Sequence, residues 1–111
     1  SSVGKCLLAF GQDVDLSVYE SHPLTVYTEY TIRSLEQLKE ELDDVREKGY
    51  AIDREELELG LTCIGAPILD RSGHAIAAIS LSGPKSRMLA GDFCERVRAV
   101  TEAARKISTN F

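Results

Sequence analysis

The stretch from Lys48 to Pro84, KGYAIDREELELGLTCIGAPILDRSGHAIAAISLSGP, contains the densest β pattern in the chain. β-branched and other apolar residues concentrate in three short runs within it, at residues 50–53, 61–69 and 75–82. The four residues Asp-Arg-Ser-Gly at 70–73, between the last two runs, have the composition of a turn. The stretch therefore predicts an antiparallel sheet with a β-hairpin, on which flanking helices would pack.

Side chains alternate between the two faces of a strand, so the length of the hairpin loop decides which residues share a face. A four-residue loop would place Cys63 opposite Ser80, and a two-residue loop would place it opposite Ser82. Either even loop puts all three residues on one face, whereas an odd loop or a bulge would separate them. Buried hydroxyls need partners, so this face predicts a contact with protein, water or a small ligand. The alternative, which spacing alone favours, is that the serines bond only neighbouring backbone or face water.

Clear helical patterns lie before the sheet. Residues 2–10 carry apolar side chains at helical spacing. Residues 34–48 begin with a capping box of Ser34 and Gln37, and Gly49 follows them, a residue type that commonly ends helices. Both segments are therefore predicted to be helices with one apolar face each.

The remaining patterns extend this α+β reading to the rest of the chain. Less regular patterns predict a short helix at residues 13–20 and an extended segment at residues 24–33. A last helix is predicted over residues 92–109, and its buried face would consist of Phe93, Val97, Val100, Ala104 and Ile107.

The start of the helix at residues 2–10 is a candidate anion site. The first backbone N–H groups of a helix lack intrahelical partners, and those of Ser2 and Val3 would be available here. The alternative is an ordinary capped helix end packed on the core, which is the commoner situation.

Length, charge and cysteine content limit the classes of function. The 111 residues are enough for one domain, and the 43% apolar and 28% charged residues are typical of a globular protein. The net charge of −5 argues against direct binding to nucleic-acid phosphates or to an anionic membrane. Cys6, Cys63 and Cys94 form neither a disulfide framework nor a zinc motif. With no signal peptide and no apolar run of about 18 residues, a soluble cytoplasmic protein is expected.

The sheet stretch also contains a long motif. Its residues are Gly49, Asp53, Glu56, Cys63, Ile64, Gly65, Ile68 and Asp70. An S-x-G-K-x-x-L-A start at Ser2 and an I-S-L-S-G-P run at residues 79–84 accompany it. With these motifs the chain resembles the C-terminal effector-binding domain of the IclR family of bacterial transcription regulators. Leu69 departs from the pattern, because the family usually has an aromatic residue or histidine there.

The resemblance covers essentially the whole chain and implies its architecture. It implies a GAF-like α/β (α+β) fold, with an antiparallel sheet flanked by helices. Residues 1–111 would form a single domain, the C-terminal part of an effector-binding domain. The winged helix-turn-helix and the first strands of the effector domain are absent from the sequence, so an incomplete sheet with an exposed edge is expected. Such an edge leads us to expect that the chain self-associates or is less stable alone.

The resemblance also implies a ligand site for a small organic acid, with no metal and no cofactor. The ligand carboxylate would meet the backbone N–H groups at the start of the first helix. An acidic side chain in the sheet would accept a hydrogen bond from a ligand hydroxyl or hold the serine hydroxyls in place. Carried over position by position, the ligand-binding residues are Ser2, Val3, Asp53, Cys63, Ser80 and Ser82.

The function expected on this basis is transcription regulation by a sensing module. It would form a homo-oligomer, a dimer or tetramer, and would act on DNA only through the absent N-terminal domain, with no membrane partner. One alternative is an oligomerisation domain without a working pocket. Another is an enzyme with Cys63 as nucleophile, but neither His22 nor His74 is placed to serve as its base. A metal at Asp53 and Cys63 would lack enough ligands. The identity of the effector, the regulatory sign, the target genes and the oligomeric state do not follow from the sequence.

Overall fold

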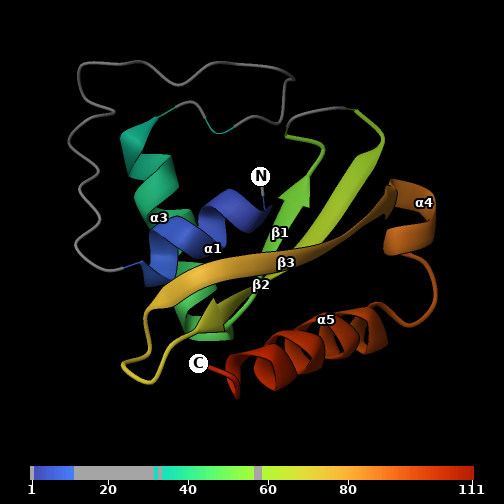
Figure 1. Cartoon of the computed structure of the whole chain (residues 1–111). Helices are drawn as coiled ribbons and strands as arrows, with labels where there is room; N and C mark the ends of the chain where they lie inside the picture. The colour runs from blue at the N-terminus through green and yellow to red at the C-terminus, as the bar shows by residue number, and fades with distance from the viewer. Residues whose placement is uncertain (1, 12–31, 33, 57–58) are drawn as a thin grey trace.

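The structure, a computed structural model, describes residues 2–11, 32, 34–56 and 59–111, in which two helices precede three consecutive strands and two helices follow them. Seven elements lie within these residues (Figure 1). In chain order they are α1 (Ser2–Phe10), α3 (Leu35–Lys48), β1 (Ala51–Arg54), β2 (Leu61–Leu69), β3 (Ala75–Pro84), α4 (Lys85–Met88) and α5 (Phe93–Ser108).

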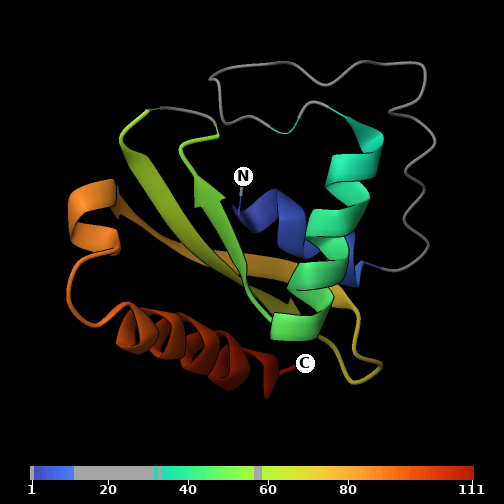
Figure 2. The same ribbon diagram turned by 180° about the vertical axis from the view of Figure 1, so that it is seen from behind.

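The three strands form one antiparallel sheet in the order β1-β2-β3, with helices on both faces. α5 runs along one face, and α1 and α3 lie on the other, as the two opposite views show (Figures 1 and 2). This is an α+β fold with an antiparallel sheet flanked by helices, as the sequence predicts.

Two apolar clusters hold the layers together, one on each face of the sheet. Because side chains alternate along β2, its even-numbered apolar residues point to α5 and its odd-numbered residues point to α1. Complete burial of a large aliphatic side chain stabilises a fold by about 1.5–3 kcal/mol, and Leu42 and Ile64 are both 0% exposed. The α1/α3 cluster contains Cys6, Ala9, Leu38, Leu42, Val45 and Ala51, and the α5 cluster contains Ile64, Ala66, Ile68, Met88, Val100 and Ala104.

The predicted boundaries of α3 are confirmed by its caps. The hydroxyl of Ser34 accepts a hydrogen bond from the backbone N–H of Gln37 at 3.1 Å. Gly49 adopts the left-handed conformation, with φ of 84°, and its N–H donates to the carbonyl of Val45 at 2.8 Å. Both groups satisfy backbone atoms that the helix itself leaves unpaired.

The C-terminal part differs from the prediction in three details. β3 runs two residues further than predicted, to Pro84, and the short helix α4 was not predicted. Ile107, predicted to be buried, is 38% exposed. The inward position in the last turn of α5 is instead Ser108, four residues after Ala104, and its hydroxyl accepts from the N–H of Leu69 at 3.0 Å.

Two predicted elements cannot be compared with the structure. The predicted helix at residues 13–20 and the extended segment at 24–33, apart from residue 32, fall outside the described residues. Among the described helices, none is both long and apolar enough to cross a lipid bilayer.

β3 lies at one end of the described strand order, and none of its residues is buried.

Candidate functional site

Three of the predicted site residues form a row across the sheet. Cys63 in the central strand lies opposite Asp53 on β1 and opposite Ser82 on β3. The hydroxyl of Ser82 donates to the sulfur of Cys63 at 3.1 Å. Asp53 and Cys63 are buried, at 2% and 9% exposed, whereas Ser82 is exposed. The row therefore leads from a buried carboxylate to an accessible hydroxyl on the face that α1 covers.

The register of the hairpin produces this row in an unexpected way. Five residues, 70–74, separate β2 from β3, and a bulge interrupts the pairing between Ile68 and Leu69. The five-residue loop alone, or the bulge alone, would move the serines to the other face. Each of them shifts the pairing register by one residue, so the two shifts together restore the original face. Ser80 and Ser82 consequently share the face of Cys63, as predicted.

The start of α1 rests directly on the sheet beside this row. Gly65, the next residue of β2 on the same face, lies opposite Ala51 and Ser80. A Cβ atom added to Gly65 would come within 2.9 Å of both the Cβ and the Oγ of Ser2. Ser2 is only 1% exposed, and Val3 follows it half-buried. The absence of a side chain at Gly65 is thus what allows the helix to begin there.

The structure therefore brings all six predicted residues into one region between the first turn of α1 and the sheet. Ser2 and Val3 belong to the helix start, and the other four belong to two neighbouring rows of the sheet. The contact between Ser2 and Gly65 was not predicted. The motif position of Gly65, a residue without a side chain in the middle of a buried strand, is the signal that would have indicated it.

A turn after β1 holds the carboxylate of Asp53. Its Oδ1 atom accepts a hydrogen bond from the backbone N–H of Glu56 at 3.0 Å. Between them, Glu55 adopts a left-handed conformation with φ of 59°, which is unusual for a residue with a side chain. Two hydrogen bonds hold Glu55 in place, both at 3.0 Å. Its backbone N–H donates to the carbonyl of Leu61, and its side-chain Oε1 accepts from the N–H of Gly60.

Lys5 is a buried cation that the sequence reasoning noted only as part of a motif. Its ammonium group, on a residue 4% exposed, donates to the Ile52 carbonyl at 2.6 Å, to Glu56 at 2.8 Å and to Glu41 at 3.0 Å. Three donors thus meet three acceptors, which satisfies the ammonium completely. The pKa of Glu56 is raised, since burial disfavours its charged form more than Lys5 favours it. The signal in the sequence is a lysine on the apolar side of α1, between Ser2 and Ala9.

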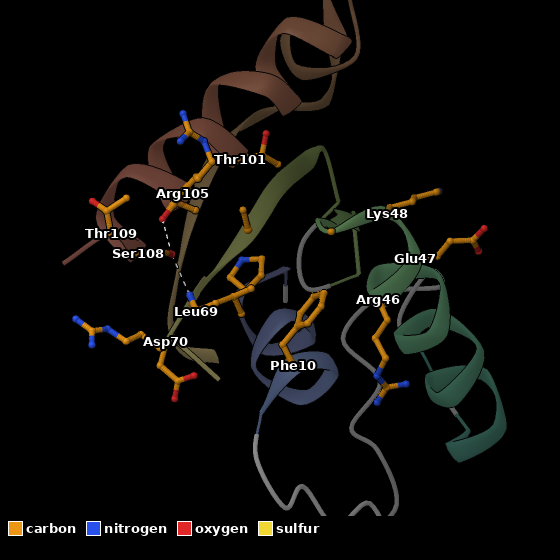
Figure 3. Close-up of a pocket in the computed structure, with 15 residues that line it drawn as sticks. Phe10, Arg46, Glu47, Lys48, Leu69, Asp70, Thr101, Arg105, Ser108 and Thr109 are labelled. Atoms are coloured by element: carbon orange, nitrogen blue, oxygen red, sulfur yellow. Dashed lines mark hydrogen bonds between the residues drawn. The ribbon is translucent and has the colours of Figure 1, made fainter. Parts of the chain in front are cut away.

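The described surface has several hollows, and one of them touches a predicted residue, Ser82. A hollow of about 290 Å³ is lined by Ser82 together with Leu59, Leu61 and Pro84. A hollow of about 500 Å³ lies between the ends of α3, β2 and α5, with Phe10 between α3 and β2 (Figure 3). It contains none of the predicted residues.

The hollow of about 500 Å³ has a lining of mixed charge. The C-terminal ends of α1, α3 and α5 contribute to it, and helix C-termini carry partial negative charge. Its ionisable side chains are four basic ones, Arg46, Lys48, Arg71 and Arg105, and two acidic ones, Glu47 and Asp70. The region beside Ser2 is the candidate site because the predicted residues gather there.

The three thiols should differ strongly in reactivity. Burial raises the pKa of the Cys6 thiol to about 11, and Cys63 is also buried, whereas Cys94 is exposed. We expect iodoacetamide at neutral pH to modify Cys94 at least roughly tenfold faster than the other two, because the thiolate is the reactive form and needs access. Peptide mass spectrometry over a time course measures the three rates. Rapid labelling of Cys63 would instead support a nucleophilic role.

Among the described residues, no histidine lies close enough to Cys63 to act as its base. His74 precedes β3, eight residues before Ser82, which corresponds to roughly 26 Å along a strand. His22 lies outside the described residues. Within the described part of the chain, no group of three histidine, cysteine or acidic side chains could hold a metal ion.

Comparison with known proteins supplies independent evidence. Residues 1–109 match the family model described as bacterial transcriptional regulator IclR, C-terminal. The chain is 41% identical over 109 residues to the HTH-type transcriptional regulator BhcR of Paracoccus denitrificans, an alignment covering 97% of this chain and 39% of the relative. The chain spans about two fifths of the length of the curated relatives it matches.

Solved structures give the same result. The C-terminal domain of the Escherichia coli transcriptional regulator KdgR has a TM-score of 0.86 and 42% identity, with 98% of this chain and 67% of that one covered. The inducer-binding domain of the transcription factor PobR from Acinetobacter, a double mutant in complex with 3-hydroxybenzoic acid, has a TM-score of 0.77 and 29% identity. That match covers 97% of this chain and 63% of the other.

Proposed function

Because the chain belongs to the IclR family of bacterial transcriptional regulators, as their C-terminal domain, we propose that it senses a small organic acid and transmits the signal to a separate DNA-binding domain. The family consists of transcription regulators rather than enzymes. Cys63 accordingly has a role in binding or packing in this proposal, and no chemical step is assigned to it.

The observation that carries the proposal is the position of the α1 start over Gly65, beside the row of Asp53, Cys63 and Ser82. Backbone N–H groups at a helix N-terminus and two exposed serine hydroxyls are donors suited to a carboxylate. The complex of the PobR domain with 3-hydroxybenzoic acid supports an organic acid as the class of ligand.

The proposed binding mode assigns each residue a part. The carboxylate of the acid accepts from the N–H groups of Ser2 and Val3 and from the hydroxyls of Ser80 and Ser82. The buried carboxylate of Asp53 accepts from a hydroxyl of the ligand or of a serine. Ligand binding can change the regulator only if it favours one arrangement of domains over another, and such coupling is typically about 1–3 kcal/mol.

The same proposal covers the partners and the setting. A homo-oligomer is expected, because the exposed β3 has an edge that another chain or segment could pair with. With a net charge of −5, the chain itself would not grip DNA, so DNA is contacted through a separate domain. Residues 1–111 then act as one domain in the cytoplasm.

Thermal unfolding with a panel of acids tests the proposal. We expect one of pyruvate, glyoxylate and 3-hydroxybenzoate to stabilise the protein by about 2.7 kcal/mol when present at about 100 times its dissociation constant. The Ser80→Ala/Ser82→Ala variant should lose most of this shift, because two donors to the carboxylate disappear. A matched control, Ser72→Ala/Ser86→Ala, removes two exposed hydroxyls elsewhere and should keep it.

The second candidate function gives a different result in the same experiment. If no acid changes the melting temperature while the melting temperature rises with protein concentration, the domain serves oligomerisation without a working pocket. Equal shifts in both double-serine variants would contradict the assigned binding mode.

A further inference from the structure

Lys5 connects the two halves of the proposed acid site. It lies one helical turn after Ser2, so it belongs to the part of α1 whose N-terminus faces the sheet. Its ammonium group reaches the carbonyl of Ile52, the residue immediately before Asp53, at 2.6 Å. It also reaches the carboxylate of Glu56 at 2.8 Å. One side chain on α1 thus bonds to the chain both before and after Asp53.

The turn between Ile52 and Glu56, the two residues that Lys5 bonds, determines where the carboxylate of Asp53 lies. Its Oδ1 atom accepts from the backbone N–H of Glu56, the residue whose side chain Lys5 holds. Glu55, between them, has a left-handed backbone conformation that needs support from its surroundings. A displacement of Glu56 would therefore move the N–H that orients Asp53.

We propose that Lys5 and Glu56 are positioning residues that hold the Asp53 carboxylate at a set distance from the N-terminus of α1, and thereby determine the affinity of the acid site. This inference rests on the proposed function. Lys5 acts without touching the acid, because it is 4% exposed and all three of its donors are already used.

Two glutamates that form ion pairs with the ammonium group of Lys5 provide a matched test. Glu41 on α3 contacts Lys5 at 3.0 Å but has no place in the turn, whereas Glu56 forms part of it. Glu56→Gln should weaken pyruvate binding by about tenfold, and Glu41→Gln by less than about twofold. Isothermal titration calorimetry measures both affinities, and urea unfolding shows whether the two variants have lost similar stability.

A second measurement needs no ligand. The amide of residue 56 donates to Asp53 in the structure, so its hydrogen exchange, followed by NMR, reports on the turn directly. We expect exchange at this amide to become about tenfold faster in Glu56→Gln and to stay unchanged in Glu41→Gln.

The outcomes separate this inference from the proposed function. Wild-type exchange at residue 56 in the Glu56→Gln variant would overturn the positioning role, as would equal losses of pyruvate affinity in the two variants. If wild-type protein binds no pyruvate, the proposed function fails for that acid, and the exchange rates alone decide whether Glu56 positions Asp53.

Discussion

Replacing Lys5 with methionine should lower the free energy of unfolding by about 3 kcal/mol at neutral pH. Methionine keeps much of the apolar stem but removes the ammonium from the carboxylates of Glu41 and Glu56 and from the Ile52 carbonyl. Removal of one partner from a buried ion pair leaves the other charge uncompensated. We expect a loss of stability at the low end of the range for a broken buried ion pair. The reason is that the side chains of Glu41 and Glu56 are still 24% and 15% exposed to water.

The pH dependence distinguishes lost charge compensation from lost packing. Burial already raises the pKa of Glu56, and the bond from Lys5 lowers it, so the variant should have a still higher value. A carboxyl whose folded-state pKa exceeds its unfolded value contributes most stability below the unfolded value, and this contribution is lost as pH rises through the folded value. The Lys5→Met deficit should therefore be smaller at about pH 5 than at about pH 7.5.

Urea unfolding of the wild type and the variant at both pH values measures this difference. Lys39→Met is the control, since Lys39 is an exposed lysine of α3, and it should change stability by less than about 0.5 kcal/mol. A Lys5→Met deficit that is the same at both pH values would contradict the role assigned to the charge.

Substitution of Gly65 by alanine should cost about 2 kcal/mol of stability and should abolish binding of the acid found in the thermal panel. The new methyl group would lie 2.9 Å from the Cβ and Oγ of Ser2 and 3.0 Å from its backbone carbon, all closer than van der Waals contact allows. Backbone cannot rotate away as a side chain can, so the first turn of α1 has to lift from the sheet. The N–H groups proposed to bind the carboxylate would move with it.

Gly83 offers a matched comparison in the neighbouring strand. A Cβ atom there would meet only the side chain of Met88, at 3.2 Å from its sulfur, and a methionine side chain can adjust. Gly83→Ala should cost less than about 1 kcal/mol and should leave acid binding intact. Wild-type affinity in the Gly65→Ala variant, measured by calorimetry, would show that the start of α1 does not form part of the site.

Local patterns predicted most of the fold. The capping box at Ser34, the glycine after α3 and the β2 boundaries depend on neighbours in sequence, and all three are confirmed. The prediction of Ile107 as a buried residue was wrong, because Ser108 takes the inward position and bonds the backbone of Leu69, a partner 39 residues away.

The sequence by itself also determined the family, the two-faced sheet and the residues that gather on one of its faces, because strand periodicity and a long motif are properties of consecutive residues. Only the tertiary structure decided how these residues are held. The five-residue loop and the bulge cancel only when both are present, and Ser2 meets Gly65 only once α1 lies on the sheet. The bonds from Lys5 to residues 36, 47 and 51 positions away have no periodic signal in the chain. Their partners are selected by the packing of α1 between α3 and the sheet, which leaves a buried ammonium group no other way to satisfy its donors.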